Sequence, residues 1–316
     1  MAVNDRKRIF IVGGAGVDIQ ATSFEKIISQ DSNPGKYSVS CGGVGRNVAI
    51  NASLLGFDVD ILCTLGNDTN GNTVLADFNK YGINTFHILT VGDAETSAYM
   101  SLHEPDGEMY AAVSSMQIND FLTRAIVETK MELINSCSAC FIETNVSAEV
   151  LDYITRNCRV KLFLDTVSEH KSQRAKNVIG KFHSIKPNLQ EAEILCGFTI
   201  TSTFELLKAA DYFHRKGVEN VFISLGRSGV FFSGQDGQGI AVCCNADVKN
   251  VTGAGDAFIA GIIHADLSGL SIEGQAIWGT AAAILALSSN ECVNTALSSE
   301  SIKEVISGGG IYVKKF

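Results

Sequence analysis

Short apolar, β-branched runs recur along the chain, and segments with apolar residues at helical spacing lie between them. An apolar run without polar alternation is typical of a strand that is buried on both faces of a parallel sheet. The alternation predicts an α/β fold with a mostly parallel sheet covered by helices. Strands are expected at residues 8–13, 58–64, 83–91, 139–143, 161–165, 183–186 and 220–224. Helices are expected at 43–56, 70–81, 147–157, 188–196, 202–216, 254–268 and 272–288.

Two segments depart from this pattern. Residues 17–40 and 94–113 alternate polar and apolar positions and contain the turn signals Asn33-Pro34-Gly35 and Pro105-Asp106-Gly107. Such hairpins would form a small sheet that stands off the main one, and we interpret this sheet as a lid. A further hairpin is expected near 229–244. No linker or repeat interrupts the chain, so we expect one domain over 1–316 with a discontinuous lid.

Composition narrows the possible partners. The chain has 316 residues, 46% of them hydrophobic, and a formal net charge of −9. Basic residues cluster only in the short ends Arg6-Lys7-Arg8 and Lys314-Lys315, so neither nucleic acid nor an anionic membrane is expected as the main partner. The first apolar run, Ile9 to Val12, is too short for a signal peptide or a membrane span. We expect a cytoplasmic protein.

The nine cysteines do not form a metal or disulfide pattern. Only Cys137 and Cys140 have the C-x-x-C spacing, and they enter an apolar run that predicts a buried strand. Small buried hydrophobes in a reducing compartment explain the cysteines better than a zinc or redox role.

The segment from Asn250 to Asp256 carries the clearest chemistry. Gly253, Ala254 and Gly255 let several backbone N–H groups point into one space directly before a helix, which makes an anion site. A carboxylate beside a bound anion is useful where an acceptor hydroxyl must lose its proton as a phosphoryl group arrives, with Asp256 as the base. Alternatively, the glycines form an ordinary turn and Asp256 is only a helix N-cap.

A second glycine-rich segment lies near the N-terminus. Gly42 and Gly43 would let a small ligand approach the backbone, and Asn47 would hydrogen-bond a polyol. A helix that packs closely on the sheet would need similar glycines. Asp18 follows the first strand and would hold two vicinal hydroxyls, or else serve as a turn residue. The preceding Gly-Gly-Ala-Gly lacks the dinucleotide-binding pattern, so an NAD-dependent oxidoreductase is weakly supported.

Together, the Gly42–Asn47 and Asn250–Asp256 segments resemble the paired signatures of the ribokinase-like (PfkB) sugar and nucleoside kinases, over essentially the whole chain. The resemblance implies a three-layer α/β/α sandwich with a small β-sheet lid, and ATP and Mg²⁺ as cofactors. It implies that Asp256 is the catalytic base and that Gly253, Ala254 and Gly255 form the anion hole. Asp18, Gly42, Gly43 and Asn47 would then hold the sugar.

The same resemblance places the nucleotide and the metal. Asn188 and Glu191 match the family's N-x-x-E element, which organises Mg²⁺ through its waters; without the family, Glu191 would be taken for a solvated helix position. The residues assigned to the nucleotide are Asn188, Ser224, Gly226, Gly229, Thr252, Gly253, Gly255 and Asn294. Many family members have an Asp-Thr pair, which helps bind K⁺, where this chain has Asn250-Val251. We therefore expect weak or absent activation by K⁺.

The substrate within the family depends on the lid. Residues 31–36 resemble the pseudouridine kinases, which implies transfer to the ribose 5′-hydroxyl, and Ser32, Asn33 and Lys36 have groups that could reach a uracil edge. A plain turn would explain the same hexapeptide. Glu143 and Asn145 end a strand at the same sheet edge and either touch the ribose or base or are an ordinary strand terminus.

Two other interpretations of the function remain open. One is a kinase of the same family for ribose, fructose or another nucleoside, and another is a non-catalytic regulator that binds a sugar or nucleoside. Finally, Tyr99, Leu102, Tyr110 and Val113 suggest an apolar lid face, through which we expect a homodimer.

Overall fold

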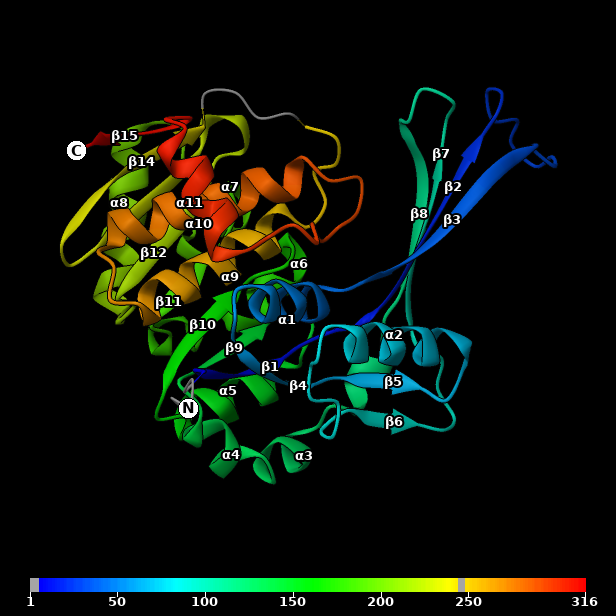
Figure 1. Cartoon of the computed structure of the whole chain (residues 1–316), viewed down its shortest axis with the longest axis horizontal. Helices are drawn as coiled ribbons and strands as arrows, with labels where there is room; N and C mark the ends of the chain where they lie inside the picture. Colours follow the sequence, from blue (N-terminus) through cyan, green and yellow to red (C-terminus); the bar gives the residue numbers. More distant parts are fainter. Residues whose placement is uncertain (1–5, 244–247) are drawn as a thin grey trace.

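The computed structural model describes residues 6–243 and 248–316. Its main sheet has nine strands in the order β15-β14-β13-β12-β11-β10-β9-β1-β4 (Figure 1). The six strands from β12 to β4 run parallel, and β13, β14 and β15 add an antiparallel edge. The strands are β1 (Arg8–Val12), β4 (Asp58–Leu62), β9 (Ala139–Glu143), β10 (Lys161–Asp165), β11 (Ser184–Lys186), β12 (Asn220–Ser224), β13 (Val230–Gly234), β14 (Gly237–Cys243) and β15 (Ile311–Lys315).

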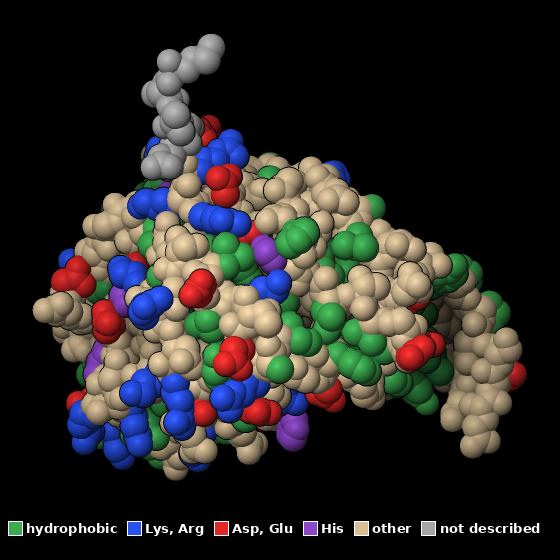
Figure 2. All heavy atoms as spheres, turned by 90° about the horizontal axis from the view of Figure 1, so that it is seen from below, with side chains coloured by type: hydrophobic (Ala, Val, Ile, Leu, Met, Phe, Trp, Pro, Cys, Tyr) green, Lys and Arg blue, Asp and Glu red, His purple; other side chains and the backbone are tan. Residues whose placement is uncertain are grey.

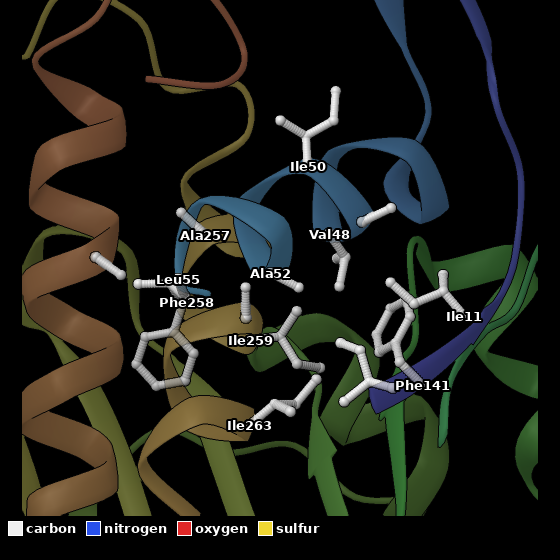
Figure 3. Close-up of a cluster of buried hydrophobic side chains, with 14 of the residues drawn as sticks. Ile11, Val48, Ile50, Ala52, Leu55, Phe141, Ala257, Phe258, Ile259 and Ile263 are labelled. Carbon is white, nitrogen blue, oxygen red and sulfur yellow. The ribbon is translucent and has the colours of Figure 1, made fainter. Parts of the chain in front are cut away.

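Helices cover both faces of this sheet and complete the predicted three-layer sandwich. On one face, α1 and α9 pack on β1 and β9 through side chains such as Val48, Ile259 and Phe141 (Figure 3). A second apolar cluster joins the other face to the helices that cover it, α5 and α8 among them. The helices are α1 (Val44–Leu54), α2 (Thr69–Lys80), α3 (Arg124–Glu128), α4 (Met131–Ser136), α5 (Ala148–Asn157), α6 (Glu169–Ser172), α7 (Leu189–Cys196), α8 (Thr203–Lys216), α9 (Ala254–Leu267), α10 (Ile272–Leu287) and α11 (Ser299–Ser307).

The small sheet predicted from the alternating segments is present and extends away from the main body (Figure 1). Its strands are β2 (Gly16–Ser23), β3 (Gly35–Gly42), β7 (Ser97–His103) and β8 (Met109–Ser115), in the order β3-β2-β7-β8. The two hairpins meet through the parallel pair β2 and β7. Because side chains alternate along a strand, each row of cross-strand neighbours belongs to one face.

The prediction for residues 83–91 was wrong in extent and in pairing. Only Leu89–Val91 forms a strand, β6, and it pairs with β5 (Thr64–Gly66) in a separate two-stranded sheet. Before it, Asn84 makes a single bridge to Asp60, and the chain then turns so that Phe86 is 83% exposed. Residues 83–88 therefore belong to the connection between α2 and β6, and this segment adds no strand to the main sheet.

The sequence analysis also missed the C-terminal elements α11 and β15. The five residues of β15 have apolar residues only at Ile311, Tyr312 and Val313. This strand is fixed by pairing with β14, 68 or more positions earlier in the chain, as in Cys243 with Ile311. Such pairing is a tertiary contact that a short window of sequence cannot reveal.

No helix in residues 6–243 or 248–316 is long and apolar enough to cross a membrane. On the face shown in Figure 2, basic side chains are interspersed with acidic ones. The cysteines of the described part of the chain are free thiols, and the same part holds no cluster of His, Cys, Asp and Glu suited to a metal ion. Cys244 lies outside the described residues.

Candidate active site

The candidate site lies at the carboxyl ends of the parallel strands. The order of the sheet places β4 on one side of β1 and β9 on the other, so the chain changes direction at β1. Ligands of open α/β sheets bind at such a switch point. Here the turn after β1 meets the end of β9, because the Gly14 amide donates a hydrogen bond to Oε1 of Glu143.

A pocket opens at this point between the main sheet and the base of the small sheet. We call it the switch-point pocket. It contains three residues that the sequence assigned to the substrate, Asp18, Gly43 and Asn145. The other lining residues are Gly14, Ala15, Gly16, Val17, Ser97, Ala98, Tyr99, Met116 and Asn119. Ser97, Tyr99, Met116 and Asn119 were not predicted as site residues; Ser97 and Tyr99 lie on β7, and Met116 is the N-cap of, and Asn119 lies in, the short 3-10 segment that follows β8.

The glycines before α1 allow close packing of the backbone. Gly43 has φ 99°, and a Cβ atom there would lie 2.7 Å from the carbonyl oxygen of Gly14. At Gly42, a Cβ atom would lie 2.3 Å from Oδ2 of Asp18, so this glycine makes room for the carboxylate. Burial raises the pKa of Asp18, and the charge of Arg46 opposes that shift. The close packing considered as the alternative for this segment is therefore confirmed, and contact of these glycines with a ligand stays a prediction.

The anion-site segment forms the start of α9. Gly253 is the N-cap residue, with φ 85°, and a Cβ atom there would lie 1.9 Å from the carbonyl oxygen of Cys292. The amides of the first helical turn lack intrahelical acceptors and carry the positive end of the helix dipole. Asp256 is the third helical residue, so the alternative that it is the N-cap is wrong.

The carboxylate of Asp256 is buried beside these amides. Asp256 is 8% exposed, and its Oδ2 accepts a hydrogen bond of 2.8 Å from Nδ2 of Asn47, 209 positions earlier. Burial, and then the charge of Asp165, raise the pKa of Asp256 to about 7, while Asn47 and Lys186 oppose the shift. A carboxyl group with a pKa near neutrality is suited to accept and release a proton. Asn47 thus contacts the predicted base.

Lys186 is a site residue to which the sequence analysis gave no role. It ends β11, is 9% exposed, and its Nζ lies 2.9 Å from Oδ2 of Asp165. A Cβ atom at Gly255 would lie 2.8 Å from this Nζ, so the ammonium lies against the glycine turn of α9. Its position at the end of a predicted parallel strand, just before the N-x-x-E element, could have identified Lys186 as a site residue from the sequence.

Asn188 and Glu191 form a capping box at the start of α7. The Asn188 amide donates to Oε2 of Glu191 at 2.9 Å, and the Glu191 amide donates to Oδ1 of Asn188 at 2.8 Å. Glu191 also accepts a hydrogen bond from Oγ1 of Thr166 and is 4% exposed, so the solvated position considered from sequence is wrong. Burial raises the pKa of Glu191.

The donor set fits Mg²⁺ bound through water. Oε2 of Glu191 accepts hydrogen bonds from the Asn188 amide and from Thr166, whereas Oε1 accepts one, from Nδ2 of Asn188, and retains a further lone pair. Mg²⁺ keeps several of its waters and uses few direct carboxylates. Waters of a hydrated ion could therefore donate to Glu191, and the positive charge would favour its ionised form.

The residues assigned to the nucleotide divide into two groups: those in the loops that lead into the site, and one whose side chain is hydrogen-bonded within the fold. Ser224 bridges to Asn188 and starts the loop that contains Gly226 and Gly229. Gly229 has φ 96°, and a Cβ atom there would lie 2.2 Å from the carbonyl oxygen of Ala241, so the turn requires glycine. Thr252 precedes the N-cap of α9, and its amide donates to Oδ1 of Asn250 at 2.9 Å.

Asn294 belongs to the second group, because its side chain is used within the fold. Its Nδ2 donates to the carbonyl oxygen of Leu285 at 2.6 Å, and its Oδ1 accepts from the Ala296 amide at 2.9 Å. Asn250 is similarly engaged, since its Nδ2 donates to the carbonyl oxygen of Asn290 at 3.2 Å. With both ends of the Asn250 amide occupied, the expectation of weak K⁺ activation stays a prediction with a structural rationale.

Three predicted substrate residues lie away from the pocket. Ser32, Asn33 and Lys36 are in the β2–β3 connection and at the start of β3, where Lys36 pairs with Thr22. Thr22 lies four positions after Asp18 along β2, which is about 13 Å of strand. Asn33 accepts from the Ile28 amide at 2.8 Å and donates to two backbone carbonyls, so its side chain holds the turn. The structure does not bring these residues to the site.

Glu143 and Asn145 do reach the site, by different routes. Glu143 is fully buried, and its carboxylate accepts hydrogen bonds from the amides of Gly14 and Asn145. It therefore fixes the floor of the switch-point pocket. Asn145 lines the pocket and accepts a hydrogen bond from Nζ of Lys171 at 2.5 Å.

The buried carboxylate of Asp256, the start of α9 and the buried Lys186 thus meet at the carboxyl edge of the parallel sheet of this α/β fold. The model of the pfkB family of carbohydrate kinases matches residues 6–299, so the chain belongs to that family.

Named relatives and solved structures agree with this assignment. The chain is 33% identical to a pseudouridine kinase of Escherichia coli K12 over 298 residues, which cover 94% of this chain and 95% of the relative. It is 29% identical to a ribokinase of Haemophilus influenzae, covering 89% and 92%. A carbohydrate kinase structure from Agrobacterium tumefaciens superposes with a TM-score of 0.82 at 26% identity, covering 95% and 97%. Arabidopsis thaliana ribokinase, solved with ribose and ATP, shares the fold with a TM-score of 0.84 at 19% identity, covering 95% and 99%.

The raised pKa of Asp256 predicts a pH-dependent cost in stability. A carboxyl group whose folded pKa lies above its unfolded value favours folding at low pH, and this contribution is lost as pH rises through about 7. Asp256→Asn removes the buried charge and keeps a hydrogen-bond acceptor for Asn47. We expect it to raise Tm by roughly 2–5 °C at pH 8 and by less at pH 5. Thermal unfolding at both pH values measures this, and an equal or larger gain at pH 5 would contradict it.

Proposed function

We propose that this kinase phosphorylates pseudouridine at the ribose 5′-hydroxyl, with ATP as the donor and Mg²⁺ as the metal. The observation that carries the proposal is the buried Asp256 beside the unpaired amides of α9, at the edge where Asp18 and Asn145 line the switch-point pocket. The choice of pseudouridine is supported by the E. coli relative with 33% identity.

In the proposed reaction, the ribose lies in the switch-point pocket, where Asp18 accepts hydrogen bonds from its hydroxyls. Asp256 takes the proton from O5′ as that oxygen forms a bond to the γ-phosphorus and the bond to the leaving ADP oxygen breaks. The amides of Ala254 and Gly255 stabilise the negative charge on the transferring group. Lys186, against Gly255, supplies a fixed positive charge near the same point.

Asn188 and Glu191 would hold the metal through its waters. When bound, Mg²⁺ offsets phosphate charge and orients the phosphates for in-line transfer. The small sheet would close over the pocket and exclude water, which otherwise competes as an acceptor for the phosphoryl group.

Two other functions have specific support. The ribokinase relative favours a free sugar such as ribose, or fructose by the same chemistry, as acceptor. A regulator that binds a sugar or nucleoside without catalysis would keep the pocket, but it would have no use for a buried base with a pKa of about 7 beside an anion site. We therefore favour an enzyme over a binding protein.

An acceptor panel tests the choice of substrate. ADP release from Mg-ATP is measured with pseudouridine, uridine, adenosine, ribose and fructose. We expect the highest kcat/KM with pseudouridine, because the relative with that name matches nearly the whole chain. Preference for ribose or fructose would support a kinase but contradict a nucleoside as its acceptor. No ADP release with any acceptor would favour the non-catalytic regulator.

Asp256→Asn tests the base. We expect turnover to fall by about 10²–10⁴-fold, because the hydroxyl then lacks a proton acceptor, while binding of the nucleoside changes little. In the wild type, turnover should rise with pH through about 7, as Asp256 ionises. Isothermal calorimetry with the nucleoside separates binding from catalysis. Near-normal turnover in the variant would reject the assignment.

The small sheet supports a homodimer, although through other residues than the sequence suggested. Register places Val39, Ile19, Met100 and Val113 in one row, on the same face as Leu102. Tyr99 lies in the row of Asp18, on the opposite, polar face that borders the switch-point pocket, and Tyr110 is out of register with Leu102 and Val113. The four most exposed apolar residues of the first face are Tyr37 (76%), Val39 (50%), Met100 (41%) and Val113 (60%).

We propose that this apolar face packs against the same face of a second copy. The wild type should sediment as a dimer at micromolar concentration, and Val113→Lys should shift it to monomer because it places a charge in the interface. Phe204→Lys is the matched control, since Phe204 is 72% exposed but lies on α8. A monomeric wild type, or equal effects of the two variants, would contradict the proposal.

A further inference from the structure

The orientation of the Asn47 side-chain amide decides whether a hydrogen-bond donor or an acceptor faces the carboxylate of Asp256. Nδ2 of Asn47 donates to Oδ2 of Asp256 at 2.8 Å. The reversed amide would place its oxygen against the carboxylate, where two acceptors repel each other. Nothing on Asp256 enforces the first orientation when the carboxyl is protonated, because it could then donate to the amide oxygen. The amide must be held from its other end.

Arg46 holds that end. Its Nη1 donates to Oδ1 of Asn47 at 2.8 Å and to the carbonyl oxygen of Cys41 at 3.1 Å. An oxygen that already faces a guanidinium cannot turn toward Asp256 without losing this charge-assisted bond. Arg46 is 7% exposed, so little water is available to replace the contact.

Asp77 in turn holds Arg46. Its Oδ2 accepts from Nε of Arg46 at 2.9 Å and from Nη2 of the same guanidinium. Asp77 lies on α2, which packs beside β2 and β3 at the base of the small sheet. The contacts thus run from α2 through Arg46 and Asn47 to Asp256, and Asp77 bonds to neither of the last two residues.

We propose that the Arg46–Asp77 ion pair is a positioning element that fixes Asn47 with its Nδ2 toward Asp256 and so keeps the base ready to accept the proton of the acceptor. The proposal rests on the proposed function, in which Asp256 is the base. Arg46 and Asp77 are positioning residues, because neither contacts the reacting atoms.

The other charged groups around Asp256 come from neighbouring strands. Asp165 of β10 and Glu143 of β9 raise its pKa, and Lys186 of β11 lowers it. Loss of the Asn47 hydrogen bond removes a contribution that favours the ionised form, so the pKa of Asp256 rises further. Asp18 and the thiol of Cys292 lie near Arg46, and neither replaces its hydrogen bond to Asn47.

The test compares pH profiles of kcat/KM in full-length variants. Asp77→Asn keeps the shape of the side chain but removes its charge, and Arg46→Lys keeps the charge but loses the forked geometry. We expect each to move the acidic limb of the profile upward by about half a pH unit or more, with a larger loss of kcat at pH 6.5 than at pH 8.5. KM for the acceptor should change less than kcat.

Asp60→Asn is the matched control. Asp60 forms a comparable two-bond pair with Arg8, is 1% exposed, and lies on β4 away from Asp256. This variant should lose stability without moving the acidic limb. An unshifted limb in both Asp77→Asn and Arg46→Lys, or an equal shift in Asp60→Asn, would overturn the proposal.

Failure of the base assignment gives a different result. If the wild type has no acidic limb near neutrality, or Asp256→Asn retains turnover, then Asp256 is not the base and this proposal falls with it. If the limb exists and depends on Asp256 but does not respond to Asp77→Asn or Arg46→Lys, only the positioning role is wrong. If Asp77→Asn does not fold, Arg46→Lys provides the same comparison.

Discussion

Four carboxylates and one ammonium are buried together at the carboxyl edge of the parallel sheet, and the site depends on this concentration of charge. Asp165, Glu191 and Asp256 lie around Lys186, Glu143 lies near Asp256, and all four carboxylates are at most 8% exposed. Removal from water favours the neutral form of an acid, and neighbouring negative charges add to this effect. The raised pKa of Asp256 is therefore a property of the cluster, since an aspartate in water has a pKa of about 3.8 and is ionised throughout the neutral range.

The cluster is stable because hydrogen bonds and close backbone packing compensate for burial. Glu143 accepts amide hydrogen bonds from two loops, and Glu191 completes the capping box of α7. Gly43 lets the start of α1 approach the turn after β1, and Gly253 lets the start of α9 approach the backbone of Cys292 in the loop after α10. The apolar side chains beneath α1 and α9 then fix these helices on β1 and β9 (Figure 3). The core thus positions Asn47 against Asp256.

Side chains alternate between the two faces of the small sheet, and the two faces differ in character. Its polar face carries Asp18 and Tyr99 toward the switch-point pocket, and its other face leaves Met100 and Val113 exposed. A shift of one residue in register would exchange the two faces. The pairing of β2 with β7 therefore decides which residues line the switch-point pocket and which are exposed on the opposite face.

The sequence by itself determined the alternation of strands and helices, the small sheet, and the segments that hold Asp18, Asn47 and Asp256, because local hydrophobic periodicity and glycine-rich turns are short-range signals. Glu191 was assigned only through the resemblance to the ribokinase-like kinases. Only the tertiary structure decided that β6 leaves the main sheet, that β15 joins it, and that Asn33 and Asn294 serve the fold. It also brought Lys186 and the Arg46–Asp77 pair into the site, and it separated Tyr99 from Val113. These outcomes depend on strand register and on contacts between residues far apart in the chain, where neither the spacing of residues nor their propensity carries information.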